Sequence, residues 1–328
     1  MMDMRKLGRS GIEVSPMGLG TWAMGGPTTH GGLQSGWGEV DDDQSMAALE
    51  RGLEFGVNFI DTADVYGTGH SERLVGQVIA GRRDEIIVAT KFGFEYDEIQ
   101  REISGGRGDR DYVMEACDRS LERLGIDTID LYQFHLGGYD GDAEETRDAL
   151  EELVAEGKIR WFGWSTDNPD NARIFAEADH CCAVQQSLSV LGGNWETLRV
   201  CHEEDLASIN RGPLVKGLLT GKFTHDSTFG DRDNRRRWDL REGTQAEQLR
   251  MFEQVRDVLA SAGRTPAQGA LCWLWGLSDR TIPIPGVKTP EQAEENARAM
   301  EHGPLSVDEM QQIDEILGRD GGYREWPV

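Results

Sequence analysis

The sequence predicts an α/β fold, specifically a (β/α)8 TIM barrel with an N-terminal β-hairpin and extra C-terminal helices. Short apolar runs alternate with amphipathic stretches along the chain, which is the pattern of repeated βα units. Eight such units follow one another, and no proline- or serine-rich linker interrupts them. The length of 328 residues suits one large barrel, so we expect residues 1–328 to form a single domain.

The elements can be assigned in order along the chain. Two short apolar segments around a Gly-Arg-Ser-Gly turn predict a hairpin from Met4 to Ser15. The barrel strands are expected in the apolar runs Pro16–Thr21, Asn58–Asp61, Ile86–Lys91, Ile129–His135, Ile159–Trp164, Ala183–Leu188, Ala207–Asn210 and Thr281–Ile284. The helices between them are expected at Asp43–Phe55, Ser71–Ile79, Arg110–Leu124, Ala143–Glu156, Asn168–Glu177, Thr197–Glu204, Gln245–Ala260 and Pro266–Leu277. The segment from Pro290 to Leu317 predicts two further helices, the second beginning near Ser306.

Three of the connections are long for a barrel, namely Ala23–Asp41, Phe92–Asp109 and Phe223–Thr244. Long connections on the C-terminal side of barrel strands usually build the active site. We therefore expect a functional site at that end of the barrel.

The composition excludes several classes of protein. Lysine and arginine number 34 against 59 aspartate and glutamate residues, and the net charge of −25 would repel nucleic acid and anionic lipid. No run approaches the roughly 18 apolar residues of a membrane span, and the N-terminus lacks the apolar segment of a secretion signal. The five cysteines show neither disulfide nor metal-ligand spacing. We expect a cytoplasmic protein without a metal, and the sequence leaves open whether its acidity reflects high salt.

Two glycine-rich segments resemble nucleotide-binding motifs without fitting them. Gly18–Ala23 has the spacing of the dinucleotide fingerprint, yet the Met-Gly-Gly-Pro that follows would not continue a helix. Gly217–Phe223 is one residue short of a P-loop, and Phe223 stands where the magnesium-binding hydroxyl would be. The sequence therefore predicts neither a Rossmann domain nor a P-loop.

Four polar side chains lie at the carboxyl ends of neighbouring predicted strands. Asp61 ends the second strand, Tyr66 follows it closely, Lys91 ends the third strand and His135 ends the fourth. A barrel brings these strand ends to one mouth, and charged groups rarely end apolar strands unless they are paired or functional. Taken singly, each has a structural alternative: an ion pair for Asp61 and Lys91, a rim aromatic for Tyr66 and a loop contact for His135. Their conjunction favours a catalytic site.

These residue types suit proton transfer to a carbonyl oxygen. A free tyrosine has a pKa of about 10, and a neighbouring ammonium such as Lys91 is expected to lower the pKa of Tyr66. Asp61 would hold Lys91 in place, and His135 would orient the carbonyl by hydrogen bonding. No side chain supplies a hydride, so the reaction requires a redox cofactor.

The motifs around these residues resemble those of the aldo-keto reductase family. They are Asn-Phe-Ile-Asp61-Thr-Ala-Asp-Val-Tyr66-Gly, Ala-Thr-Lys91, Asp130-Leu-Tyr-Gln-Phe-His135, Gly157-Lys-Ile-Arg-Trp-Phe-Gly-Trp-Ser165, Gly217-Leu-Leu-Thr-Gly-Lys222 and Ile284-Pro-Gly286. The resemblance spans Met4 to Leu317 and implies a TIM barrel that binds NADP(H) without a Rossmann domain, with NADH left open. It implies that Tyr66 is the general acid, that Lys91 and Asp61 tune it, and that His135 orients the carbonyl.

The resemblance also implies a cofactor site and a substrate pocket. Ser165 and Gln185 would bind the nicotinamide carboxamide, and Arg211 would lie where the family stacks a ring or guanidinium on the nicotinamide. The residues implied for the pyrophosphate are Gly212, Leu214, Gly217 and Lys222. The other implied cofactor contacts are Gly20, Thr21, Trp22, Asp61, Thr166, Gly286, Lys288, Thr289, Gln292, Glu295 and Asn296. The implied substrate pocket consists of Trp22, Tyr66 and His135.

Two departures from well-known relatives affect the cofactor site. Thr166 stands where many relatives have asparagine, which leaves open how fully the carboxamide is held. The slots that bind the 2′-phosphate in those relatives include Gly286 and Gln292 here, so this segment resembles the bacterial branch with a Pro-Gly-Ala-Lys type of loop. Lys288 and Thr289 are then the implied phosphate partners, and they favour NADPH.

The leading hypothesis is an NADP(H)-dependent oxidoreductase that reversibly reduces an aldehyde, ketone or sugar carbonyl to the alcohol. One alternative is a redox-sensing regulatory subunit similar to the potassium-channel β subunits. A second is a cofactor-free lyase or epimerase that forms a Schiff base on Lys91. The expected partner is a small carbonyl compound rather than nucleic acid or a membrane, and the chain is expected to be a monomer or a small homo-oligomer.

Overall fold

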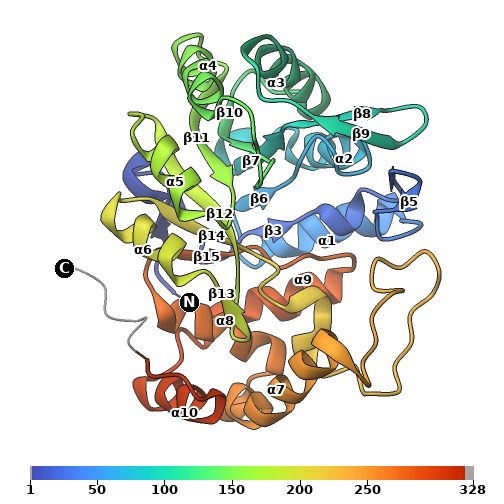
Figure 1. Ribbon diagram of the computed structural model, residues 1–328, viewed down its shortest axis with the longest axis vertical. Helices are drawn as coiled ribbons and strands as arrows, with labels where there is room; N and C mark the ends of the chain where they lie inside the picture. The colour runs from blue at the N-terminus through green and yellow to red at the C-terminus, as the bar shows by residue number, and fades with distance from the viewer. Residues whose placement is uncertain (1, 322–328) are drawn as a thin grey trace.

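Within residues 2–321, which the computed structural model describes, eight parallel strands form a closed barrel (Figure 1). They are β3 (Leu19–Gly20), β6 (Phe59–Asp61), β7 (Ile87–Phe92), β10 (Ile129–Phe134), β11 (Ile159–Ser165), β12 (Cys181–Ser189), β14 (Ala207–Arg211) and β15 (Thr281–Pro283). The strands pair in chain order. Hydrogen bonds from Gly18 N to Pro283 O (2.9 Å) and from Gly20 N to Pro285 O (3.0 Å) join the last strand to the first. The predicted TIM barrel is confirmed.

The helices pack around the barrel at positions that differ from the predicted bounds by no more than two residues. They are α1 (Asp42–Glu54), α2 (His70–Ile79), α3 (Arg110–Leu124), α4 (Ala143–Ala155), α5 (Pro169–Ala176), α6 (Trp195–Glu203), α7 (Gly243–Leu259) and α8 (Pro266–Leu277). The two predicted C-terminal helices are α9 (Pro290–Ala297) and α10 (Val307–Leu317). Side chains of Asp41, Asp109 and Asp142 accept hydrogen bonds from backbone N–H groups and so cap α1, α3 and α4. None of the described helices is long and apolar enough to span a membrane.

The predicted N-terminal hairpin plugs one end of the barrel. Its strands β1 (Arg5–Lys6) and β2 (Glu13–Val14) pair antiparallel over two residues each. Leu7 and Val14 are fully buried against side chains that point into the barrel. Gly8 has a φ of 52°, and a β-carbon there would lie 2.2 Å from the backbone oxygen of Cys182. Only glycine allows the hairpin to come this close to the strands.

Side chains inside the barrel change from apolar to polar along its axis. Successive strand residues point to opposite faces, so residues two apart both face the interior. The interior positions near the hairpin are apolar, and they include Phe59, Ala89, Leu131, Ala183 and Ile209. Two residues further along the same strands stand Asp61, Lys91, Gln133, Gln185 and Arg211. The strand period therefore gathers the polar side chains at the opposite end, which we call the mouth.

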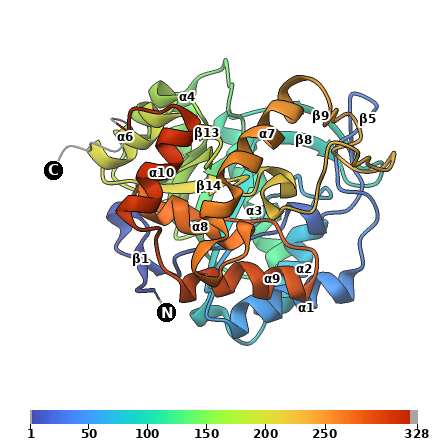
Figure 2. The ribbon, with the colours of Figure 1, turned by 90° about the horizontal axis from the view of Figure 1, so that it is seen from below.

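The first two long connections build a small sheet at the mouth. The first supplies β4 (Thr29–His30) and β5 (Leu33–Gln34), and the second supplies β8 (Phe94–Asp97) and β9 (Glu102–Gly106), in the order β5-β4-β9-β8. Figure 2 shows β5, β8 and β9 on the side of the molecule opposite β1. The third connection has no helix or strand between Lys222 and Glu242. A two-residue strand, β13 (Gly192–Gly193), folds back and pairs antiparallel with the end of β12. The three long connections thus gather at the end where we expected a site.

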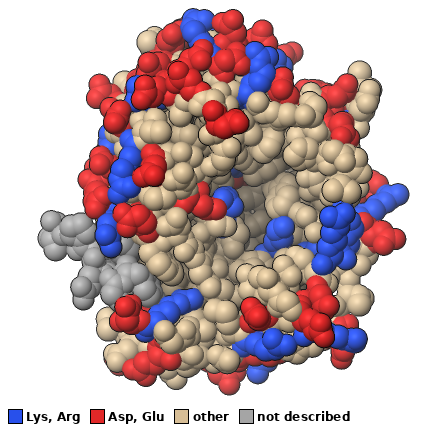
Figure 3. Space-filling view, in the orientation of Figure 1, with Lys and Arg blue, Asp and Glu red and all other residues tan. Residues whose placement is uncertain are grey.

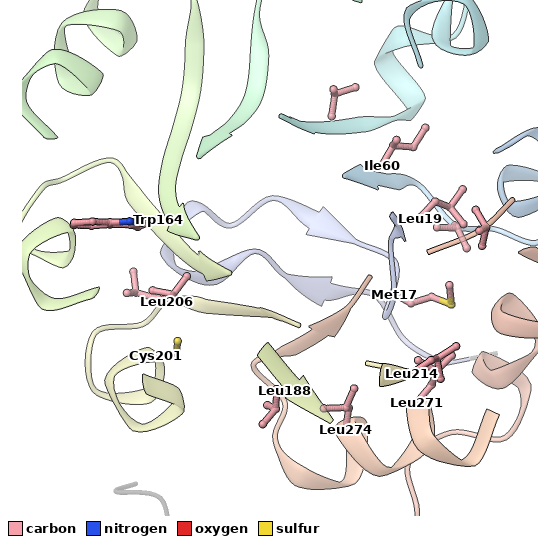
Figure 4. Packing of buried hydrophobic residues seen from close by; sticks show 14 of the residues in the cluster. Met17, Leu19, Ile60, Trp164, Leu188, Cys201, Leu206, Leu214, Leu271 and Leu274 are labelled. Atoms are coloured by element: carbon pink, nitrogen blue, oxygen red, sulfur yellow. The ribbon is translucent and has the colours of Figure 1, made fainter. Parts of the chain in front are cut away.

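The main hydrophobic core lies between the barrel and its helices. Figure 4 shows its buried side chains, among them Leu188 of β12 and Leu274 of α8. The five cysteines are all buried, and none of them forms a disulfide. Helices α7 and α8 pack closely because Gly269 has no side chain: a β-carbon there would lie 2.1 Å from the backbone oxygen of Leu259.

We expect the Gly269→Ala variant to lose about 1–3 kcal/mol of unfolding free energy, because the two helices must separate to admit the methyl group. The midpoint of thermal unfolding measures this loss. Gly230→Ala is the matched control, since no described atom lies within 4 Å of its β-carbon and its φ is not positive. Equal midpoints for the two variants would show that the α7–α8 contact adapts freely.

Candidate active site

A buried ion pair lies beneath the mouth. Lys91 Nζ at the end of β7 lies 2.7 Å from Asp61 Oδ2 at the end of β6, and the two side chains are 0% and 2% exposed. Lys91 Nζ also donates to the backbone oxygen of Thr62 (2.8 Å) and to the hydroxyl of Tyr66 (3.2 Å). Three of the four residues that the sequence predicts to be catalytic thus meet at one group, the ammonium of Lys91.

The pKa of Tyr66 is raised above its ordinary value, whereas the sequence predicted that Lys91 would lower it. Burial of the phenol raises the pKa and outweighs the lowering effect of the Lys91 ammonium, and Asp61 raises it further. Burial lowers the pKa of Lys91, but Asp61 and Tyr66 together raise it above its ordinary value. At neutral pH, Tyr66 is therefore a neutral phenol and Lys91 is a cation.

His135 follows β10 and packs against Tyr66. The two ring centroids are 5.8 Å apart, and the rings are inclined by 77°. Burial lowers the pKa of His135 well below its ordinary value, and the cations Lys91 and Arg211 lower it further. The buried Nδ1 of His135 has no hydrogen-bond partner among residues 2–321. The imidazole is therefore neutral at neutral pH, and it keeps one N–H that can donate to a carbonyl oxygen.

A chain of hydroxyl groups fixes the segment between β6 and Tyr66. Ser71 Oγ lies 2.7 Å from Thr21 Oγ1 and 2.9 Å from Thr62 Oγ1. Thr21 Oγ1 donates to the backbone oxygen of Asp61 (3.0 Å), and all three hydroxyl-bearing side chains are buried. The Thr21 hydroxyl is thus engaged within the protein, and the contact of Thr21 with the cofactor stays a prediction.

A second buried ion pair supports this segment from α2. The carboxylate of Glu72 is fully buried and accepts hydrogen bonds from Thr90 Oγ1 and Arg123 Nε, each at 2.6 Å. The sequence alone indicated no role for Glu72. Its function in the structure is to anchor α2 to β7 and α3.

Aromatic side chains line the mouth above the ion pair. The ring centroid of Trp22 lies 6.4 Å from that of Tyr66, and Phe94 lies 5.2 Å from His135. The expected pocket residues Trp22, Tyr66 and His135 therefore form one cluster. Trp37 packs edge-on against Trp22 at 5.3 Å. The sequence did not indicate Trp37, because its position depends on how the first long connection folds.

The residues expected to bind the carboxamide are only partly available. Gln185 Nε2 donates to Asp61 Oδ1 (2.8 Å), and Ser165 is the register partner of Gln185 across β11 and β12. The Thr166 hydroxyl donates to the backbone oxygen of Gly137 (3.2 Å) and accepts from the N–H of residue 168 (3.1 Å). Thr166 thus fixes the connection after β11, and its hydroxyl does not stand free for a carboxamide.

Arg211 is held at the mouth by a carboxylate that the sequence did not reveal. Its Nη2 lies 2.6 Å from Asp167 Oδ2, and its Nη1 donates to Ser187 Oγ (3.2 Å). Asp167 Oδ1 in turn accepts from the backbone N–H of Ser187 (2.6 Å). Asp167 lies two residues beyond Ser165, the last residue of β11. Only the fold shows that this position lies beside Arg211.

The segment after β14 has an unusual backbone. Val215, Lys216 and Gly217 have φ values of 47°, 51° and 88° within the short 3-10 helix Val215–Thr220. Residues other than glycine, and β-branched residues above all, rarely adopt such values, so this turn is strained. Turns of this kind point successive N–H groups to one side and can form an anion site. Gly212, Leu214, Gly217 and Lys222, expected at the pyrophosphate, lie in or beside it.

The other residues expected to contact the cofactor include a group at the seam of the barrel and at α9. Gly20 pairs with Gly286 where β3 meets the end of β15. Thr289 Oγ1 accepts from Gln292 N (3.3 Å), and Gln292 Oε1 accepts from Lys288 N (2.9 Å), so these side-chain oxygens cap α9. Further along α9, Glu295 is partly exposed and Asn296 is buried.

Three of the six lysines lie around this part of the mouth. Within residues 2–321, no carboxylate forms an ion pair with Lys216, Lys222 or Lys288. Arg235 lies beside them and pairs with Asp233 (2.7 Å). Figure 3 shows a hollow in this face of the molecule with Lys and Arg side chains at its edge. The Asp233 carboxylate acts on Lys216 and Lys288 only from beyond ion-pair distance, so a chain with a net charge of −25 keeps three lysines at the mouth that form no ion pair within the described residues.

Known proteins share both the sequence and the fold. A sequence profile of the Aldo/keto reductase family matches residues 16–318. The aldo-keto reductase yakc of Schizosaccharomyces pombe, named for NADP(+), is 32% identical over 277 residues, which cover 82% of this chain and 81% of that protein. The NADH-specific methylglyoxal reductase of Escherichia coli is 32% identical over 309 residues, which cover 90% and 92%.

Among solved structures, the glycerol dehydrogenase AKR11B4 from Gluconobacter oxydans superposes with a TM-score of 0.84 at 28% identity, covering 96% of this chain and 95% of that one. The chain therefore belongs to the aldo/keto reductase family.

Proposed function

We propose that this protein is an NADP(H)-dependent reductase of small aldehydes, ketones or sugar carbonyls, with Tyr66 as the general acid. The observation that carries the proposal is the neutral phenol of Tyr66, which lies 3.2 Å from the buried Lys91 ammonium and against a neutral His135. A protonated phenol beside a cation is ready to give its proton to an oxygen on which negative charge develops.

The residues divide the proton chemistry among them. When bound, the reduced nicotinamide supplies a hydride to the carbonyl carbon. Tyr66 donates its proton to the carbonyl oxygen, and Lys91 stabilises the phenolate that remains. Asp61 keeps Lys91 charged and fixed at 2.7 Å. The N–H of His135 orients the carbonyl oxygen, and the aromatic rings at the mouth exclude water from it.

The mouth residues fit a phosphorylated dinucleotide. Gln185 and Ser165 would hold the carboxamide, and the strained turn after β14 would offer N–H groups to the pyrophosphate. Lys288 would bind the phosphate at the adenosine end. The lysines that form no ion pair within the described residues supply the positive charge that attracts phosphate groups.

The Lys288→Ala variant tests whether the protein prefers NADPH or NADH, the two cofactor types named for its relatives. We expect its Kd for NADPH to rise by roughly 10- to 100-fold, the worth of one charge-assisted hydrogen bond, while its Kd for NADH stays nearly constant. Quenching of tryptophan fluorescence measures both constants. Lys158→Ala is the control, because Lys158 directly precedes β11, at the end of that strand opposite the mouth. Its amine pairs there with Asp118 at 2.7 Å. Equal losses for NADPH and NADH would remove Lys288 from the phosphate site.

Multiple turnover on a panel of small carbonyl compounds tests the function itself. The loss of absorbance of the reduced nicotinamide measures the turnover. Sustained turnover supports a reductase, and a single slow oxidation of bound cofactor would instead support the redox-sensing alternative. Schiff-base chemistry on Lys91 is disfavoured because its ammonium is held by Asp61, Thr62 and Tyr66, and a charged amine is not a nucleophile.

A further inference from the structure

The two oxygens of the Asp61 carboxylate have different partners. Oδ2 accepts from Lys91 Nζ (2.7 Å). Oδ1 accepts from Gln185 Nε2 (2.8 Å) and, at a longer distance, from Gln133 Nε2 (3.3 Å). Gln185 Nε2 also donates to Gln133 Oε1 (3.1 Å). The catalytic carboxylate is therefore tied to two amide side chains as well as to the lysine.

The positions of these amides follow from the barrel. Gln133 lies on β10, two residues before His135, so both face the interior. Gln133 is also the register partner of Lys91 on the neighbouring β7. Gln133 is 0% exposed and Gln185 is 1% exposed. A buried amide must satisfy its donors and its acceptor locally. Polar groups this deep have few alternatives to the contacts that they make.

These contacts fix which way the Gln185 amide points. Its NH2 group has two hydrogens, and Asp61 Oδ1 and Gln133 Oε1 are both acceptors that take one each. A carboxylate and a carbonyl oxygen reject the alternative orientation, in which the oxygen of Gln185 would face them. No donor of the described chain contacts Gln185 Oε1. Gln185 thus has only an acceptor left for a ligand.

From this arrangement, we propose that Gln133 is a positioning residue that orients Gln185 to accept a hydrogen bond from the carboxamide NH2 of the nicotinamide. The inference rests on the proposed cofactor function. Gln133 touches neither substrate nor cofactor, and it acts through Gln185. The same amide pair joins the carboxamide site to the Asp61–Lys91 ion pair, so the ring of the cofactor and the proton donor are positioned by one connected set of hydrogen bonds.

The wild-type protein gives the first test through the binding of two oxidised cofactors, NADP+ and its 3-acetylpyridine analogue. The analogue keeps the carbonyl oxygen but replaces the NH2 by a methyl group, so it has no donor for Gln185 Oε1. We expect NADP+ to bind about tenfold more tightly, because the analogue leaves a buried acceptor unpaired. Titration by tryptophan fluorescence measures both values of Kd without turnover. Equal affinity for the two would overturn the proposal, whatever the behaviour of any variant.

The Gln133→Met variant tests the positioning role. Methionine has a similar volume but no acceptor, so Gln185 Nε2 keeps Asp61 Oδ1 as its partner, and one hydrogen bond in place of two holds the orientation of the amide. We expect the tenfold preference for NADP+ to fall in part, to about threefold. The Gln185→Met variant should lose the preference completely, and the double variant should equal it, since Gln133 acts through Gln185.

The matched control is Gln186→Met. Gln186 is also 0% exposed, but as the next residue of β12 it faces the other side of the strand from Gln185. Its Nε2 donates to Ser208 Oγ (2.9 Å). This control should keep the wild-type preference even if it loses stability. A retained preference in a folded Gln133→Met variant would overturn the positioning role alone, whereas an absence of saturable NADP+ binding in the wild type would overturn the proposed function and this inference with it.

Discussion

The Tyr66→Phe variant should lose carbonyl reduction almost completely, with kcat lower by roughly 10²–10⁴-fold, the usual contribution of a general acid. Phenylalanine keeps the ring that packs near Trp22 and His135, but it removes the hydroxyl that lies 3.2 Å from Lys91 Nζ. Lys91 retains Asp61 and the Thr62 carbonyl as partners, so the ion pair stays intact. Steady-state rates with a reactive aldehyde measure the loss.

The binding of NADPH to this variant separates chemistry from folding. We expect the Kd of the variant for NADPH to be nearly unchanged, because the Tyr66 hydroxyl is not proposed to hold the cofactor. The pH profile adds a second readout. Because burial raises the pKa of Tyr66, wild-type reduction should persist through neutral pH and decline only as the phenol ionises in the alkaline range. Reduction by Tyr66→Phe at the wild-type rate would remove Tyr66 from the reaction.

The Lys91→Met variant should lose both stability and activity. It leaves Asp61, which is 2% exposed, as a buried carboxylate without its cation, and such a loss typically costs about 3–5 kcal/mol. The double variant Asp61→Asn, Lys91→Met replaces the pair by neutral groups and should recover most of that stability. Neither variant should turn over, because the phenolate of Tyr66 would lack its cation.

Thermal unfolding midpoints and reductase rates together decide this prediction. The double variant is the control for stability, and the Gln186→Met variant controls for a change of a buried polar side chain elsewhere in the barrel. A double variant no more stable than Lys91→Met would indicate that the ion pair itself, rather than the unpaired carboxylate, carries the energy. Wild-type rates in the double variant would contradict the role of Lys91 in catalysis.

The strands and the catalytic residues were predictable because they obey local rules. Apolar runs marked the strands, and a charged residue at the end of such a run is unusual enough to stand out, as at Asp61 and Lys91. The period of two along a strand also predicts which way the two buried amides face. It places Gln133 on the same face as His135, and Gln185 on the same face as Ala183.

The sheet at the mouth was not predictable from local pattern. Strands β4 and β5 have two residues each, and β4 pairs with β9, which lies about seventy residues away in the sequence. No hydrophobic alternation develops over so short a strand. The pairing of Arg211 with Asp167 and the packing of Trp37 on Trp22 depend in the same way on contacts between distant segments.

Only the structure could give the direction in which the pKa of Tyr66 is shifted and the hydrogen-bond partners of two threonine hydroxyls. The sequence could place a cation near a phenol, but it could not weigh that cation against the burial of the ring, which prevails. It could place Thr21 and Thr166 near a cofactor, but not reveal that backbone oxygens already accept hydrogen bonds from both.

The scarcity of lysine turns the mouth into a chemical target. Lys91 is inaccessible and the amine of Lys158 lies between Asp118 and Glu156, so an acylating reagent directed at amines has chiefly Lys6, Lys216, Lys222 and Lys288 to attack. Three of these four surround one hollow. Mass spectrometry of the acylated peptides would then report occupancy of the mouth directly, since a bound dinucleotide would shield three lysines and leave Lys6 as an internal standard.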